Sequence, residues 1–176
     1  DEPEPPLDEL ARAVVDAVAG EWSARELPAA SVILEPGRSL VGPAAFTLYR
    51  VGAVKRAGER RYVAVDGGMS DNPRPQLYGA VYTALLANRA EEAAAGVYSV
   101  AGKHCEADTL IGRVALPEPR RGDLLAVPAT GAYTLALGSN YNLLPLPAVV
   151  LVADGEARLI RRRQTIDDLL AFEQRE

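Results

Sequence analysis

Four polar segments of the sequence contain residue types that could bind or transform a small molecule, and the first is Glu35-Pro-Gly-Arg38. It follows a short apolar run and brings a carboxylate and a guanidinium together. Gly37 would let the backbone approach an anion closely, and Arg38 could bind a phosphate or a carboxylate through two hydrogen bonds. A turn with a surface salt bridge at the end of a strand explains the same residues equally well.

The second segment, Asp66–Tyr78, is a shaped loop with two glycines and two prolines. It places Arg74 and Tyr78 four residues apart. Arg74 could hold a substrate carboxylate, and the Tyr78 hydroxyl could add a hydrogen bond. Taken alone, the segment is better explained as an irregular surface connection.

The third segment, Gly102–Glu106, holds the only histidine and the only cysteine of the chain. Cys105 could be an acid or a nucleophile beside Glu106, a carboxylate that could bind an ammonium group. The competing interpretation is an inert buried cysteine, the commoner fate of a single Cys. His104 alone is more often structural than catalytic.

The fourth segment comprises Pro128–Tyr133 and the nearby Ser139-Asn-Tyr-Asn142. Tyr133 follows small residues and could stack on a flat ligand or hydrogen-bond to it. The alternative is a helix start with an ordinary packed tyrosine.

Composition excludes several classes of function. The 176 residues carry a net charge of −5, which is not the footprint of a protein that binds nucleic acid or anionic membranes. The longest apolar run, Ala148–Ala153, is too short to span a membrane. One cysteine excludes an intrachain disulfide and fits a reducing compartment, and one cysteine with one histidine excludes a His/Cys metal cluster. Dinucleotide, Walker and zinc-binding motifs are absent from the sequence.

The elements that position these segments are predicted to be a helix, a buried strand and, in the rest of the chain, mostly β-strands. Helical spacing of apolar residues predicts a helix over 7–22, and the run 31–34 predicts a buried strand. Asp154-Gly155 predicts a two-residue hairpin turn, and Thr165–Asp168 predicts a capping box. The other expectations are strands over 45–54, 61–66, 97–101, 110–114 and 124–127, and a helical stretch over 81–95. The change to β character predicts a boundary near residue 44.

Six motifs, in this order, resemble the diaminopimelate decarboxylase family: EPGRSLVG, VDGGMSDNPRPQLYGA, GKHCEADTLI, GDLLAVPATGAY, SNYN and ARLIRRRQTIDDLL. That family combines a (β/α)8 barrel that binds pyridoxal 5'-phosphate with a C-terminal β domain of sandwich or barrel-like form. The resemblance implies that residues 1–44 are the last helix–strand unit of the barrel. Residues 45–176 would then be the β domain that completes the active site and the dimer interface.

The resemblance also implies a role for each candidate residue. Glu35, Gly37 and Arg38 would lie at the cofactor, with Glu35 near its pyridine nitrogen and Arg38 between phosphate and substrate. Tyr133 would contact both cofactor and substrate. Two further residues are implied at the distal end of the substrate, Arg74 and Tyr78. Cys105 would be the catalytic proton donor, and Glu106 would bind the distal ammonium.

The implied reaction converts meso-2,6-diaminopimelate to L-lysine and CO2 in a cytoplasmic homodimer with shared active sites. The chain departs from the family pattern at Leu135–Ser139 and Leu143–Leu146. It also lacks the family's Schiff-base lysine, since neither Lys55 nor Lys103 matches it. We therefore expect a C-terminal portion that is inactive alone. Two alternatives remain: a related decarboxylase of another amino acid, and a non-catalytic β domain that dimerises or regulates.

Overall fold

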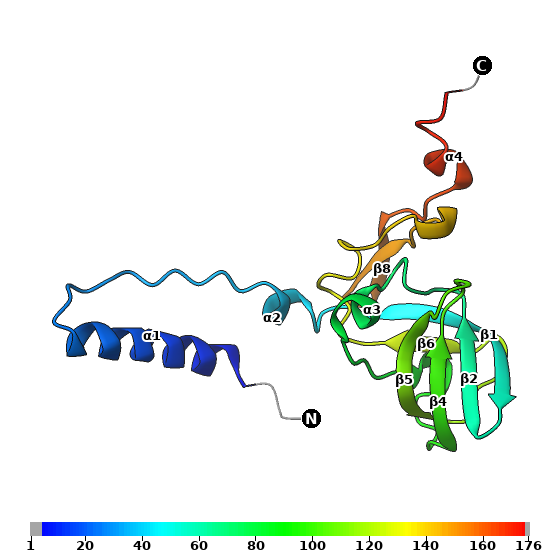
Figure 1. Ribbon diagram of the computed structural model, residues 1–176, viewed down its shortest axis with the longest axis horizontal. Helices are drawn as coiled ribbons and strands as arrows, with labels where there is room; N and C mark the ends of the chain where they lie inside the picture. Colours follow the sequence, from blue (N-terminus) through cyan, green and yellow to red (C-terminus); the bar gives the residue numbers. More distant parts are fainter. Residues whose placement is uncertain (1–4, 175–176) are drawn as a thin grey trace. The chain divides into compact units, whose positions relative to one another are not determined.

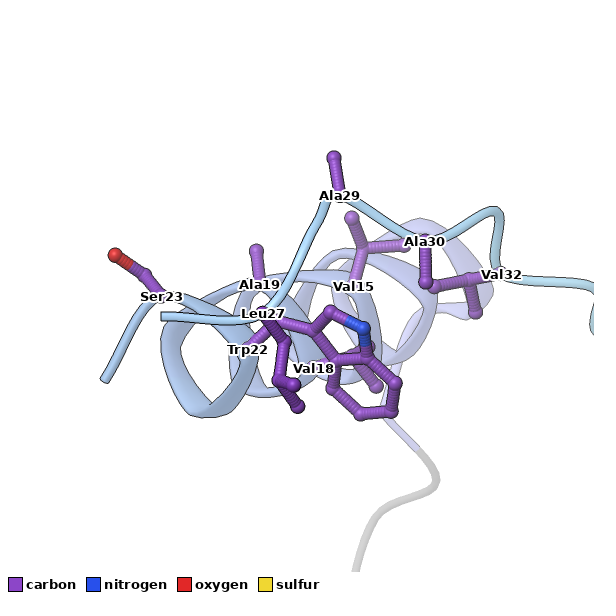
Figure 2. A pocket seen from close by; sticks show the side chains of 9 residues that line it. All are labelled: Val15, Val18, Ala19, Trp22, Ser23, Leu27, Ala29, Ala30 and Val32. Carbon is purple, nitrogen blue, oxygen red and sulfur yellow. The ribbon is translucent and has the colours of Figure 1, made fainter. Parts of the chain in front are cut away.

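The computed structural model describes residues 5–174 and forms two compact units, one ending at Leu40 and the other beginning at Val41 (Figure 1). Helix α1 (Leu7–Ala24) begins directly after Pro6, which confirms the predicted helix. The chain then returns beside α1, and the two segments form an apolar groove (Figure 2). The groove is lined by Val15, Val18, Ala19, Trp22, Ser23, Leu27, Ala29, Ala30 and Val32.

The buried strand expected over 31–34 is not formed. These residues have no strand pairing, and Ile33 is 83% exposed. A strand needs a neighbour for its backbone N–H and C=O groups, and the described part of the first unit contains no other strand. A short helix α2 (Arg38–Val41) follows. The assignment of residues 1–44 to a barrel stays a prediction.

The second unit is built on a six-stranded sheet. Its spatial order is β3-β6-β1-β2-β4-β5, and every neighbouring pair is antiparallel except β2 and β4. The five predicted strands are confirmed with small shifts of their ends, as β1 Thr47–Ala57, β2 Arg60–Val65, β4 Gly96–Ala101, β5 Thr109–Leu116 and β6 Leu124–Val127. The sixth strand, β3 Leu85–Leu86, was not predicted.

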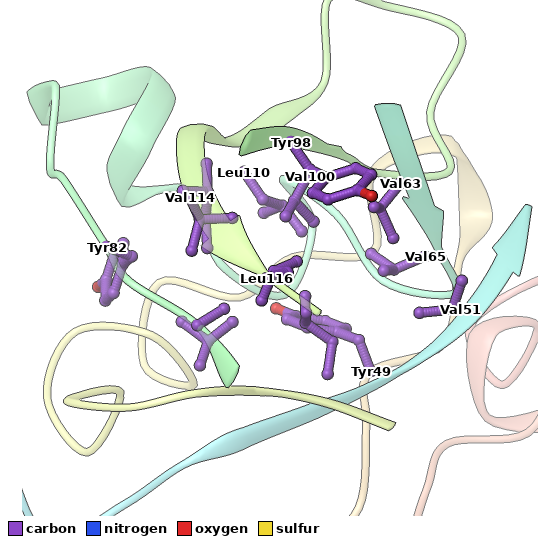
Figure 3. Packing of buried hydrophobic residues seen from close by; sticks show 14 of the residues in the cluster. Tyr49, Val51, Val63, Val65, Tyr82, Tyr98, Val100, Leu110, Val114 and Leu116 are labelled. Carbon is purple, nitrogen blue, oxygen red and sulfur yellow. The ribbon is translucent and has the colours of Figure 1, made fainter. Parts of the chain in front are cut away.

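The sheet curls around a hydrophobic core (Figure 3). Alternate residues of β1, β2 and β4 enter this core, since successive side chains of a strand point to opposite faces. Among the most deeply buried are Val51, Val63, Val100, Leu116 and Leu125.

The same alternation explains why the helical stretch expected over 81–95 is wrong. Tyr82, Ala84 and Leu86 are buried, whereas the residues between them are exposed. This spacing of two matches a strand rather than a helix. Pairing of β3 with β6 and a single 3-10 turn, η1 (Ala87–Arg89), replace the expected helix.

A separate hairpin and a short helix end the described chain. Strands β7 (Val149–Ala153) and β8 (Glu156–Arg161) pair across Asp154-Gly155, as predicted. Helix α4 (Ile166–Leu169) has the predicted capping box, in which Thr165 and Asp168 exchange hydrogen bonds. No helix within residues 5–174 is long and apolar enough to cross a membrane.

Candidate functional site

The loop that follows β2 lies against the segment that carries Cys105, and two glycines permit the contact. A methyl group on Gly68 would overlap the Asp108 carboxylate and approach the His104 ring to 2.5 Å. A methyl group on Gly102 would overlap the same carboxylate and approach the Gly68 Cα to 2.7 Å. Only residues without a Cβ fit at these two positions, so the glycines fix where the 102–108 segment lies.

Asp108 is the centre of the contact. Its Oδ2 accepts hydrogen bonds from His104 Nδ1 at 2.6 Å and from the His104 backbone N–H at 3.2 Å. Its Oδ1 accepts from the Met69 backbone N–H at 2.9 Å. Both side chains of the pair are almost fully buried, at 0% and 1% exposed. Because a carboxylate accepts, His104 donates through Nδ1, and its burial against Asp108 fits a structural role.

The same loop also contacts two other polar segments of the second unit. The Gly67 carbonyl accepts from the Lys103 backbone N–H at 2.9 Å, and the Ser70 carbonyl accepts from the Ser139 backbone N–H at 2.8 Å. From helix α3 (Arg74–Tyr78), Gln76 Nε2 donates to the Thr109 carbonyl at 3.1 Å. Three of the predicted segments, distant in sequence, are therefore held together by one buried polar cluster.

Burial shapes the electrostatics beneath this loop. Desolvation raises the pKa of Asp71, although the Gly68 N–H, Lys103 and the Ser70 hydroxyl oppose the rise. Desolvation also raises the pKa of the Tyr49 phenol, and the neighbouring Asp71 adds to the effect. Each shift favours the neutral form of its group.

Cys105 and Glu106 form the exposed end of the 102–108 segment, and the Cys105 thiol is free. The burial assumed by the competing interpretation of Cys105 is therefore not observed. Glu106 accepts from the Tyr141 hydroxyl at 2.8 Å and from Asn142 Nδ2 at 3.3 and 3.4 Å. The hydrogen bond from Tyr141 is the main reason that the pKa of Glu106 is lowered.

Arg74 and Tyr78 lie at the two ends of α3. Arg74 donates to the Tyr82 hydroxyl at 2.8 Å, and its guanidinium lies over the Tyr82 ring, 5.8 Å from the centroid. Tyr78 is 67% exposed. Within the described residues, neither the Arg74 guanidinium nor the Glu106 carboxylate takes part in an ion pair.

Tyr133 belongs to a run of turns rather than to a helix, and its φ of 60° lies in the left-handed region. Two hydrogen bonds anchor the backbone that precedes Tyr133. The Thr130 N–H donates to the Ala45 carbonyl at 3.1 Å, and the Gly131 N–H donates to the Gly42 carbonyl at 3.0 Å. The side chain is 53% exposed. The tyrosine is therefore presented to solvent by a well-anchored backbone and is not packed in the core.

Glu35, Gly37 and Arg38 belong to the first unit and are exposed. Arg38 begins α2, and the Gly37 carbonyl accepts from the Leu40 N–H at 3.1 Å. Within residues 5–174, the Arg38 guanidinium forms no ion pair or hydrogen bond, so the surface salt bridge that could have explained this segment is not formed.

Sequence patterns do not identify the residues that hold this site together. No motif singles out Asp71 or Asp108, and the Ser139–Asn142 motif gives no role to Tyr141 or Asn142. The glycines Gly68 and Gly102 were the available signal, because a glycine on each of two segments is typical of a close backbone contact.

We expect Gly102→Ala to disturb this contact while Gly112→Ala does not. An added methyl group at Gly102 has no space, and overpacking of this kind costs about 1–3 kcal/mol. Gly112 lies in β5 with nothing within 4 Å of an added methyl group, and it serves as the matched control. Thermal unfolding of the two variants measures the difference. Equal melting temperatures would show that the contact yields to the added methyl group.

Comparisons with known proteins agree with this architecture. A family model described as the C-terminal sheet domain of pyridoxal-dependent decarboxylases matches residues 14–131. The diaminopimelate decarboxylase of Mycobacterium leprae (strain TN) is 46% identical over 182 residues, which cover 99% of this chain and 39% of that protein. The diaminopimelate decarboxylase of Actinosynnema pretiosum subsp. auranticum is 52% identical over 169 residues, which cover 95% of this chain and 38% of that protein.

A solved structure agrees as well. Diaminopimelate decarboxylase from M. jannaschii, in co-complex with L-lysine, superposes with a TM-score of 0.85 at 31% identity, covering all of this chain and 40% of that one. The chain thus spans about two-fifths of the length of the relatives it matches. The expected mostly-β domain is confirmed, and the chain belongs to the pyridoxal-dependent decarboxylase family, whose C-terminal sheet domain it contains.

Proposed function

We propose that this chain is the C-terminal part of a diaminopimelate decarboxylase and that it supplies the substrate-binding and proton-donating groups of that enzyme. The single observation that carries the proposal is the exposed Cys105-Glu106 pair, which the buried polar cluster holds in place. The two relatives described above are both named diaminopimelate decarboxylase.

The exposed groups of the chain fit pyridoxal 5'-phosphate. Arg38 has a free guanidinium suited to a phosphate, Tyr133 presents a phenol, and Glu35 presents a carboxylate that could pair with a protonated pyridine nitrogen. When bound, the cofactor would accept the electron pair that remains as CO2 leaves the substrate.

The distal end of meso-diaminopimelate carries one ammonium and one carboxylate group. Glu106 and Arg74 are the complementary charges, and Tyr78 can add a hydroxyl hydrogen bond. A substrate without these distal groups would leave both protein charges unpaired, which is a strong basis for discrimination.

Cys105 would complete the reaction. The substrate carbon loses CO2 and must gain one proton, and the exposed thiol of Cys105 can donate it. The thiolate that remains takes a proton from water before the next turnover.

We further propose a cytoplasmic homodimer in which Cys105 and Glu106 reach the active site of the partner subunit. The family resemblance supports the shared site, and the free thiol supports a reducing compartment. Light scattering of the complete gene product that contains this chain should give twice the mass of one subunit.

We expect the complete gene product, loaded with pyridoxal 5'-phosphate, to decarboxylate meso-diaminopimelate and to prefer it over lysine and ornithine by about 10²-fold or more in kcat/KM. Lysine and ornithine offer a distal ammonium to Glu106 but no distal carboxylate, so the charge of Arg74 would stay unpaired with either of them. Release of CO2 from each substrate measures the preference. Equal rates would support a decarboxylase of another amino acid, and no release from any substrate would support a non-catalytic domain.

A further inference from the structure

The Glu106 carboxylate is held from outside its own segment. Tyr141 and Asn142 belong to η2 (Tyr141–Leu143), 35 and 36 residues further along the chain, and both donate hydrogen bonds to it. An exposed glutamate normally samples many rotamers, and ordering such a side chain costs conformational entropy. Here two donors from one turn restrict the carboxylate before any ligand arrives.

Tyr141 is itself fixed by the buried cluster. Its ring stacks on that of His104, with centroids 5.8 Å apart and planes 21° apart. His104 is in turn hydrogen-bonded to Asp108. The position of the Tyr141 hydroxyl therefore depends on the same cluster that positions Cys105.

The turn around Asn142 is strained and strongly tethered. Asn142 and Leu143 have φ values of 56° and 54°, a region that asparagine adopts with little cost and leucine adopts only under strain. Asn140 Nδ2 donates to the Leu144 carbonyl at 2.9 Å and to the Gln164 side chain at 2.6 Å. Strain of this kind persists where the surroundings impose it, and it concentrates at functional sites.

We infer that Tyr141 and Asn142 are positioning residues that orient the Glu106 carboxylate toward the distal ammonium of the substrate and so set the preference for substrates that carry this group. The inference rests on the proposed function. A carboxylate held in place keeps free lone pairs for the ammonium and loses little freedom when the ammonium binds.

The groups around Glu106 predict how the binding of the distal ammonium depends on pH. The groups that act on Glu106 are Tyr141 and Asn142 from η2 and His104 from its own segment, and Cys105 acts in turn on Tyr141. The Tyr141 hydrogen bond lowers the pKa of Glu106, so the carboxylate stays ionised to lower pH. Without that hydroxyl the pKa rises, and binding of the ammonium is lost at a higher pH on the acid side.

The test compares Tyr141→Phe with the wild type in the complete, cofactor-loaded enzyme. We expect KM for meso-diaminopimelate to rise about three- to tenfold. We expect kcat to change little, because the distal ammonium is bound equally in the ground state and the transition state. The acid limb of kcat/KM should move to higher pH. Asn142→Gly, which keeps a residue that tolerates positive φ, should raise KM in the same direction.

Equilibrium binding provides a readout that is independent of turnover. Isothermal titration should show weaker binding of L-lysine to the Tyr141→Phe variant. Binding of 6-aminohexanoate should be unchanged, since this ligand is lysine without the α-ammonium. Tyr62→Phe is the matched control, because the Tyr62 hydroxyl makes no hydrogen bond in the described residues; it should behave as wild type.

The two proposals fail in different ways. A wild-type enzyme that does not decarboxylate meso-diaminopimelate overturns the proposed function. A wild-type enzyme that is active, together with a Tyr141→Phe variant that has unchanged L-lysine affinity and an unchanged acid limb, overturns the positioning role alone. Equal weakening of L-lysine and 6-aminohexanoate also overturns it, since the effect would not depend on the ammonium.

Discussion

Cys105→Ala in the complete gene product is expected to lower kcat for meso-diaminopimelate by a factor of about 10²–10⁴, the range that a positioned proton donor contributes. The thiol is exposed and lies beside Glu106, so it can meet a substrate whose distal ammonium is bound to that carboxylate. Steady-state CO2 release measures the loss. Binding of L-lysine should stay close to wild type, because the variant removes a proton and leaves the binding charges in place.

The control is Ala107→Ser, an exposed position on the same segment. It changes the surface of the segment without removing a titratable group, and we expect kcat within about twofold of wild type. If the Cys105→Ala variant kept more than about a tenth of wild-type kcat, another group would have to donate the proton, and the role proposed for Cys105 would be wrong.

Asp108→Ala is expected to lower the stability of the second unit by roughly 3–5 kcal/mol, the cost of breaking a buried hydrogen-bonded charge. The variant leaves His104 Nδ1 and the Met69 N–H without their acceptor in a site closed to water. Hydrogen exchange in β4 and β5 of the complete protein measures the local stability, because Asp108 lies between these two strands.

Two further variants serve as comparisons for the loss of stability expected of Asp108→Ala. Asp108→Asn keeps one carbonyl acceptor and should cost less than the alanine variant. Asp167→Ala removes an exposed aspartate of α4 and should change stability by no more than about 0.5 kcal/mol. If Asp108→Ala were as stable as Asp167→Ala, the buried pair would not be what fastens the Cys105 segment.

Patterns local in the chain were predictable because their causes are local. The Asp154-Gly155 hairpin and the Thr165 capping box depend on residues only a few positions apart. Helix α1 follows from apolar spacing over consecutive turns. The helical stretch expected over 81–95 failed because alanine and leucine there favour a helix by propensity, whereas pairing with β6 imposes a strand.

The sequence by itself determined which polar residues could do chemistry: Arg74, Cys105, Glu106 and Tyr133, with the family resemblance that gives them roles. Only the tertiary structure decided how they are held. The approach of Gly68 to Gly102, the hydrogen bond from the Met69 N–H to Asp108 and the contact of Tyr141 with Glu106 all join residues more than thirty positions apart. The spacing along a chain does not specify which distant groups pair. Packing of the curled sheet specifies it, because a buried carboxylate must find its donors inside the fold.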